Sequence, residues 1–453
     1  MVKIMELKKY KDNNYKRKSY VILVIGFLLL SISSYLFYKS YALYEEKKDF
    51  NVINGTVEDP GDIYFAYYID GIISRNMPVQ NTGYTLDTTK SNCNNGVVPT
   101  WDYAGWKFIG DYHNYSATTN TRTKCTLYFN KTAKTVKTAL GNIEVNSYTP
   151  DFTKSACDDE SCESHEKGIY ETTDNDGNPT YYYRGSVENN YVKFAGFYWR
   201  IIRINSNGSI RMIYDGTVAH KNGEASEDRQ YGTSPFNFSN GDNMYVGYMY
   251  TSGEAHGTST SSVIKTNVDK FYADKLSNYT SKLDTNAGFC GDRSSYNTHA
   301  NVGISNTITY YKANTRFNRG TPTLACENNN DYYTNIDSAN GNKKLTYSIG
   351  LISLDEAVFA GYASSYYDRL LKPPKNVNGY LSTNIGYWTM TPSMYAHLFG
   401  FSQACASNYD IGQVAGETYT SSNLREGLKP VINIRSDVTI TGTGTMTDPY
   451  VIK

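Results

Sequence analysis

The sequence lacks a surplus of charge of either sign. It holds 44 Lys and Arg residues against 44 Asp and Glu residues, so the formal net charge is zero. Beyond a cluster of lysines and one arginine near the N-terminus, no basic stripe appears along the chain. Binding to nucleic acid requires clustered cations that neutralise phosphates. We therefore expect no nucleic-acid partner.

Residue sets that mark several enzyme classes are also missing. The six histidines are scattered, and no H-E-x-x-H motif occurs. Ser262-Val263-Ile264-Lys265 matches the S-x-x-K of penicillin-binding enzymes, but the K-T-G motif of that class is absent. Ser262 also precedes a helical pattern, where Ser is a favoured N-cap. We expect no catalytic residue set, and a binding protein rather than an enzyme.

Two short segments contain part of the ligand pattern of a known metal site. Cys157, Cys162 and His165 could offer three zinc ligands, but a fourth is not evident, and a disulfide between the cysteines is simpler. The stretch 174–178 (DNDGN) resembles the start of a calcium loop, but Pro179 stands where an EF-hand needs Gly. We interpret it as a hairpin turn. Zinc and surface calcium remain the alternatives to an expectation of no metal and no cofactor.

Only one long apolar run is present, the 19 uncharged residues 20–38. At about 1.5 Å per residue this run spans roughly 28 Å, close to the hydrocarbon thickness of a bilayer. Basic residues precede it, so the N-terminus is expected in the cytoplasm and the bulk of the chain outside. A cleaved signal peptide, with Ser40-Tyr41-Ala42 as a weak cleavage site, and a buried core helix are the competing interpretations. We expect an uncleaved signal-anchor in the cell membrane.

Breaks in the pattern divide the chain into six parts. Asp59-Pro60-Gly61 ends a stalk, and the acidic run CDDESCESHE forms a linker. The expected parts are a cytoplasmic basic tail (1–19), the transmembrane anchor (20–38), a stalk (39–61), a small all-β sandwich (62–150), the linker (151–166) and a larger domain (167–453).

Seven cysteines follow the apolar run, and an external location permits disulfides. Proximity and similar settings favour the pairs Cys93–Cys125, Cys157–Cys162 and Cys290–Cys326, although sequence alone cannot fix connectivity. Cys405 is then unpaired. Its apolar neighbours favour a buried small side chain, and a free thiol is the alternative.

The larger domain shows clear local patterns. Four strands separated by turns are predicted over 181–216, and apolar residues at helical spacing predict an amphipathic helix over 263–283. Ser353 and Glu356 form the two ends of a capping box at the start of a helix that Gly361 ends. Trp199 and Trp388 lie in the middle of predicted strands. We expect them either to be core residues or to form a stacking platform for a ligand.

Three segments of this domain together resemble a known family. They are LISLDEAVFAG (351–361), YWTMTP (387–392) and GLKPVIN (427–433). Their order resembles the C-type-lectin-like fold, and more closely the branch shared by formylglycine-generating enzymes, phage tropism determinants and uncharacterised surface proteins of Firmicutes and related gut bacteria. The resemblance implies an α+β C-type-lectin-like head over 167–453. It is moderately specific for the fold and weakly specific for activity.

The chain departs from this family at its chemical sites. The Glu-Pro-Asn, Gln-Pro-Asp and Trp-Asn-Asp triplets of calcium-dependent lectins are absent. Formylglycine-generating enzymes need paired cysteines for copper near the end of the domain, where only Cys405 is present. Calcium-dependent sugar binding is therefore not implied, and formylglycine chemistry is in doubt.

The sequence thus predicts a membrane-anchored extracellular binding or display protein, acting in adhesion or in recognition of a protein or glycan. The chain has 44 tyrosines, a residue favoured at binding faces and also in β-strands. Residues 393–423 are expected to supply the binding face, with Tyr395, Asn408, Tyr409 and Tyr419 as contacts.

Two other functions remain as alternatives. One is an exported enzyme, oxidase-like or a glycan hydrolase, for which carboxylates such as Asp355 and Glu356 exist. The other is a pseudopilus-like component of an envelope machine. Prepilin processing is not favoured, because Gly26-Phe27 lies inside the apolar run rather than before it.

Overall fold

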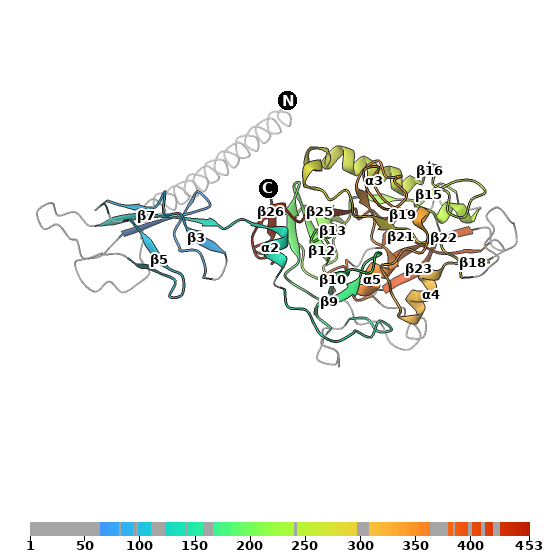
Figure 1. Cartoon of the computed structure of the whole chain (residues 1–453), viewed down its shortest axis with the longest axis horizontal. Coiled ribbons are helices and arrows are strands. Elements are labelled where there is room, and N and C mark those ends of the chain that lie inside the picture. Colours follow the sequence, from blue (N-terminus) through green and yellow to red (C-terminus); the bar gives the residue numbers. More distant parts are fainter. Residues whose placement is uncertain are drawn as a thin grey trace, which may run out of the picture. The chain divides into compact units, whose positions relative to one another are not determined.

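A computed structural model of the chain describes part of its length (Figure 1). The described ranges are 64–80, 83–94, 96, 98–109, 123–141, 143–156, 166–239, 242–296, 308–362, 379–383, 386–396, 401–408, 413–419 and 426–453, with backbone only at 64, 308, 393–396, 401–408 and 413–419. The expected anchor and stalk, the Cys157–Cys162 pair with His165, and Tyr409 lie outside these ranges. None of the helices within them is long and apolar enough to cross a membrane.

The structure is rich in β-strands, has few helices, and divides into two compact units, residues 1–130 and 131–453. The division falls earlier than the boundary expected from the sequence. Segment 131–150 belongs with the second unit because Lys134–Thr135 pairs with a C-terminal strand there and Val136 and Leu140 are buried in that unit's core.

The first unit contains a five-stranded sheet of order β2-β1-β7-β3, with β4 also on β7. Its strands are β1 (Tyr64–Ile69), β2 (Ile72–Ser74), β3 (Tyr84–Leu86), β4 (Asn92–Cys93) and β7 (Lys124–Lys131). A hairpin turn at Asp70-Gly71 joins β1 to β2, and both residues have positive φ, 48° and 83°. This conformation suits the type I′ turn for which Asp-Gly is favoured.

A two-stranded hairpin, β5 (Thr100–Asp102) and β6 (Lys107–Ile109), completes the first unit. Alternate residues of β7, namely Cys125, Leu127 and Phe129, are buried. Trp101 of β5 packs edge-on against Phe129 with ring centroids 5.0 Å apart, so the hairpin covers the sheet. The expected disulfide Cys93–Cys125 joins β4 to β7 within this core.

The second unit is built on a ten-stranded sheet of order β20-β25-β13-β12-β11-β27-β26-β8, with β10 on β12 and β9 on β10. The strands are β8 (Lys134–Thr135), β9 (Gly168–Thr173), β10 (Pro179–Arg184), β11 (Tyr191–Phe194), β12 (Phe197–Ile204), β13 (Ile210–Gly216), β20 (Ile349–Gly350), β25 (Val431–Ile434), β26 (Thr439–Thr441) and β27 (Tyr450–Ile452). The four strands predicted over 181–216 are confirmed as β10 to β13. β26 and β27 pair antiparallel near the C-terminus.

A second sheet has six strands, of order β14-β24-β21-β22-β23 with β18 on β21. They are β14 (Thr233–Ser234), β18 (Ile308–Tyr310), β21 (Tyr387–Ala396), β22 (Phe401–Asn408), β23 (Gln413–Tyr419) and β24 (Glu426–Gly427). Two short ladders pair β15 (Met249–Tyr250) with β16 (Thr260–Ser261) and β17 (Phe289–Cys290) with β19 (Tyr332–Tyr333). Cys405 lies on β22, and its side chain is outside the description.

The helices of the second unit are short. They are α2 (Val136–Leu140), α3 (Val263–Lys275), α4 (Lys312–Arg319) and α5 (Leu354–Phe359), with 3-10 turns η1 (Glu227–Arg229), η2 (Asn243–Val246), η3 (Ser277–Lys282) and η4 (Asn329–Asp331). The predicted amphipathic helix is confirmed over its first part as α3, capped by the hydroxyl of Ser262. Ile264, Val268 and Tyr272 are buried on its inner face.

Apolar side chains from both sheets and from α3 and α5 form one core in the second unit. Trp199 and Trp388 are fully buried there, and each indole N–H donates to a backbone carbonyl, that of Phe194 (3.1 Å) or Ser234 (2.6 Å). Their interpretation as core residues is therefore confirmed. A buried ring cannot serve as a stacking platform for a ligand.

Candidate functional site

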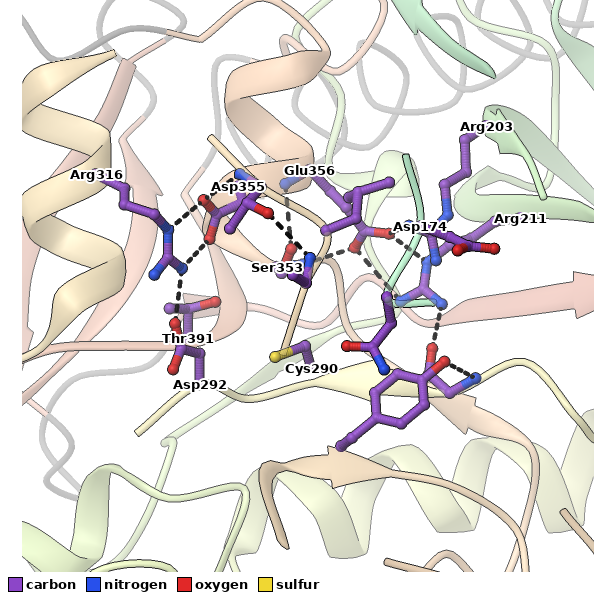
Figure 2. A pocket seen from close by; sticks show the side chains of 16 residues that line it. Asp174, Arg203, Arg211, Cys290, Asp292, Arg316, Ser353, Asp355, Glu356 and Thr391 are labelled. Carbon is purple, nitrogen blue, oxygen red and sulfur yellow. Dashed lines mark hydrogen bonds and ion pairs between the residues drawn. The ribbon is translucent and has the colours of Figure 1, made fainter. Parts of the chain in front are cut away.

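The capped helix α5 carries two adjacent carboxylates into a small pocket of the second unit (Figure 2). The predicted capping box is confirmed, because the Ser353 hydroxyl accepts from the Glu356 N–H (3.1 Å) and the Glu356 carboxylate accepts from the Ser353 N–H (2.9 Å). Both Asp355 and Glu356 are buried. Burying a carboxylate is costly unless it is paired.

Glu356 is paired with two arginines of the ten-stranded sheet. Its Oε1 lies 2.6 Å from Arg211 Nε on β13 and 3.5 Å from Arg203 Nη1 on β12. Arg211 also donates to the carbonyl of Gly288 (2.9 Å). Burial acts to raise the pKa of Glu356, but Arg211 and Arg203 outweigh it and hold that pKa below its usual value. Burial lowers the pKa of Arg211 to about 10.

Asp355 is paired on the other side of the pocket, as Figure 2 shows, with Arg316 of α4. The guanidinium donates through Nε to Oδ1 (2.9 Å) and through Nη2 to Oδ2 (2.7 Å), and Nη2 also reaches Asp292 (2.7 Å). The N–H of Thr323 donates to Asp355 Oδ1 (3.0 Å). Burial raises the pKa of Asp355, and the favourable contacts with Arg316 offset this only in part.

The disulfide Cys290–Cys326, expected from the sequence, closes one wall of the pocket. It ties β17 to segment 323–326, and the Cys326 N–H donates to the Asn175 side-chain oxygen of the β9–β10 turn (2.7 Å). The free space inside is about 40 Å³. That space admits a few water molecules but no sugar or peptide.

Neighbouring carboxylates whose pKa values move in opposite directions are typical of acid–base pairs. In this pocket, however, each oxygen of Asp355 and Glu356 already contacts an arginine or accepts from a backbone N–H. Neither carboxylate has an oxygen left without such a contact for a substrate. The arrangement therefore joins α4, α5 and the sheet, and the geometry does not favour a glycan hydrolase centred on these residues.

A second buried cluster surrounds Asp215 at the end of β13. Arg229 Nε lies 2.8 Å from Asp215 Oδ1, Lys429 Nζ 3.6 Å from Oδ1, and Arg200 Nη1 3.8 Å from Oδ2. All four side chains are at most 1% exposed. Burial lowers the pKa of Lys429 to about 7. This cluster was not predicted from the sequence. The available signal was a charged residue among the apolar residues of each of two strands, Arg200 in β12 and Asp215 in β13.

The backbone does not gather the expected contact residues at one place. Tyr395 on β21 pairs with Ser402 of β22, and Tyr419 on β23 pairs with the adjacent Gln403, so these two tyrosines flank the same end of β22. Asn408 is at the opposite end of β22, about 17 Å from Gln403 at 3.3–3.4 Å per residue. Their side chains are outside the description, and the contact roles stay predictions.

The other sequence candidates have structural roles. Ser262 Oγ donates to the Tyr248 carbonyl (2.8 Å) and accepts from the Lys265 N–H, while Lys265 Nζ pairs with Asp269 (2.5 Å). Asp174 closes the β9–β10 hairpin turn by accepting from the N–H groups of Asp176 and Asn178, which confirms the turn predicted there. Across the described ranges, no group of three or more His, Cys, Asp or Glu side chains could hold a metal ion.

No protein-family model, no curated protein and no solved structure matches the chain. Function must therefore be inferred from the geometry of the chain itself.

Proposed function

We propose that the protein is a membrane-anchored extracellular binding or display protein, acting in adhesion or ligand recognition. The N-terminal apolar run 20–38 would be its single span, the first unit a small β-sandwich module, and the second unit its C-type-lectin-like head. The ligand would be an extracellular protein or glycan.

The two disulfides carry this proposal. One lies in each unit, Cys93–Cys125 in the first and Cys290–Cys326 in the second, and both follow the apolar run in sequence. Disulfides persist in oxidising compartments and are rare in the reducing cytosol. Their positions agree with the orientation expected from the basic residues before residue 20.

A C-type-lectin-like head is supported by the order of elements in the second unit. β20 leads into the capped helix α5, β21 follows, and β24 and β25 come after it, as in the three motifs that carry the resemblance. β20, which directly precedes the first of these motifs, and β25, which carries part of the last, are also neighbours in space, since Ile349 pairs with Ile432.

Binding is favoured over catalysis because the buried carboxylates of α5 are occupied by arginines, as described above. The expected binding face remains segment 393–423, with Tyr395, Asn408, Tyr409 and Tyr419 as proposed contacts. Tyr395 and Tyr419 lie beside one end of β22, where they pair with the adjacent residues Ser402 and Gln403.

Two measurements on the full-length chain test the proposal. A C-terminal epitope tag should be removed by protease added to intact cells, while a cytoplasmic marker survives. The protein in lipid nanodiscs should then bind components of glycan and envelope-protein arrays, with weaker binding by Tyr395→Ala and Tyr419→Ala. A tag protected in intact cells, or failure to bind any component, would contradict the proposal.

A further inference from the structure

A second concavity of about 610 Å³ lies where four segments of the second unit meet. These segments are Lys167 directly before β9, the β10–β11 connection near 186–191, the loop after β13 near 221–222, and the β26–β27 turn near 445–447. We call it the groove. Its size is within the range of about 300–1,000 Å³ of small-molecule sites.

The floor of the groove is fixed by hydrogen bonds between three of these segments. Tyr191 donates from its N–H to the Gly444 carbonyl (2.8 Å) and from its hydroxyl to the His220 carbonyl (2.8 Å). The Asn222 amide donates to the Val187 carbonyl (3.0 Å). A site already ordered by its own contacts loses little entropy when a ligand binds.

The rim of the groove carries two exposed lysines, Lys167 and Lys221, and one exposed glutamate, Glu188. Across the described ranges, none of these three side chains forms an ion pair with another. Most other lining groups are hydroxyls or amides, those of Ser186, Tyr191, Asn222, Thr445 and Thr447, with Met446 beside them. The rim is therefore cationic by one charge and rich in hydrogen-bonding groups.

Buried positive charge lies directly behind the floor. Arg200 donates to the Asn222 side-chain oxygen (2.8 Å), and its guanidinium lies 3.7 Å from the centre of the Tyr191 ring. Arg200 belongs to the Asp215 cluster, in which three cationic side chains surround one carboxylate. Charges in a low-dielectric interior are screened less than those in water.

Acidic groups near the loop reduce this excess. His220 lies between the carboxylates Glu224 and Asp228, and Lys429, whose pKa burial lowers to about 7, is only partly charged at neutral pH. On the rim itself, two lysines still face one glutamate, although the whole chain has no cations in excess. A cleft with one dominant sign of charge concentrates ligands of the opposite sign.

We propose that this groove binds a small hydroxylated organic anion, a polyol or sugar ring that carries a phosphate or carboxylate. The anionic group contacts Lys167 and Lys221, and the hydroxyls exchange hydrogen bonds with the threonine, serine and asparagine side chains. This inference rests on the proposed function, because such a ligand must reach the groove from outside the cell.

Isothermal titration of the full-length chain in nanodiscs tests the inference with three probes: glucose 6-phosphate, glucuronate and uncharged glucose. Both anions should bind, and glucose should bind at least about tenfold more weakly because it gains no charge contact. Anion affinity should also fall between low and high salt. Comparison of the two anions shows whether phosphate or carboxylate is preferred.

Variants that remove a positive charge and a variant that removes a negative charge should change the affinity for the anions in opposite directions. Lys167→Met and Lys221→Met should each weaken binding of the anions about three- to fivefold, and Glu188→Gln should strengthen it. Lys344→Met, at an exposed lysine that does not line the groove, should change nothing. All four positions are exposed, so equal melting temperatures can establish that the variants fold.

Equal affinity for glucose and the anions, indifference to these variants, or no binding of any probe would overturn the inference. The proposed function would survive each result if the arrays identify a ligand and the C-terminal tag is exposed on cells. A protected tag with intact anion binding would instead overturn the proposed function and leave the groove as a binding site.

Discussion

Arg211 and Glu356 form a buried ion pair, with Nε and Oε1 2.6 Å apart, although 145 positions separate them in the sequence. The pair joins β13, a central strand of the large sheet, to the first turn of α5. Since both side chains are at most 4% exposed, neither can turn to water if its partner is removed.

Glu356→Gln should therefore destabilise the protein strongly. The change leaves Arg211 as an uncompensated buried cation, and breaking such a pair costs about 3–5 kcal/mol. Urea unfolding of the full-length chain measures the loss. Replacing both members, as in Arg211→Met with Glu356→Leu, should recover much of it. Asp437→Asn is the control, because its pair with Arg435 is about half exposed. A Glu356→Gln protein as stable as the control would show that the pair does not hold α5.

Lys429 should make stability depend on pH above neutrality. Its pKa falls from 10.5 to about 7 on burial, so between these values the unfolded chain binds a proton that the folded chain does not. Stability from this group therefore rises with pH across that window, by up to about 1.4 kcal/mol per pH unit.

Lys429→Met should remove that rise, and urea midpoints measured from pH 7.0 to 9.5 check it. The upper limit avoids the ordinary titration of tyrosine. Lys193→Met, at an exposed lysine, should keep the wild-type slope. Identical slopes in all three proteins would contradict the prediction.

The His220 imidazole should hold the loop after β13 closed. Nδ1 lies 2.9 Å from Glu224 and Nε2 lies 2.9 Å from Asp228. Ionised carboxylates only accept hydrogen bonds, so both nitrogens must donate, which requires the imidazolium form. The hydrogen bond from His220 lowers the pKa of Glu224, and the pKa of Asp228 is also lowered although burial opposes this.

Without the imidazole both carboxylates lose a donor, so amides of 217–228 should exchange faster in His220→Gln than in the wild-type protein. Hydrogen exchange of the two proteins under identical conditions measures this difference. His256→Gln, at a histidine paired with Asp331 elsewhere, should leave these amides as protected as in the wild type. Equal protection of the loop in His220→Gln and in the wild-type protein would exclude the role.

Removing the Cys290–Cys326 disulfide should loosen the pocket wall around 323–326. The bridge closes a separation of 36 residues, for which chain entropy predicts a stabilisation of roughly 3–4 kcal/mol. The double variant Cys290→Ala with Cys326→Ala should lose that much stability and become sensitive to protease near Thr323. The double variant of Cys93 and Cys125 is the comparison, since it should leave that site protected. Protease resistance at Thr323 after loss of Cys290–Cys326 would show that other contacts hold the wall.

Local patterns in the sequence predicted the elements that depend on neighbouring residues. Ser353 and Glu356 are three positions apart, so their capping box could be recognised directly, as could the hairpin turn over 174–178. The disulfide pairs Cys93–Cys125 and Cys290–Cys326 followed from proximity. Each of these features depends on short stretches of chain, where spacing limits the geometry.

Contacts between distant segments could not be predicted in this way. Nothing in the sequence around Asp215 indicates that Arg229 and Lys429 converge on it. Lys429 in particular comes from the opposite end of the domain. The pairing of β8 with β26 likewise assigns residues 131–150 to the second unit, whereas the breaks in the sequence pattern placed them with the first. The groove combines four separate segments, which, for the same reason, the sequence does not show to be neighbours.

The pairing of β8 with β26 also determines how the second unit would respond to tension. Its first strand is hydrogen-bonded to one of its last, through Thr439↔Thr135 and Ile440↔Lys134, and Lys131 forms an ion pair with Asp448. A pull on the chain entering at Lys131 would therefore be resisted first by the C-terminal hairpin.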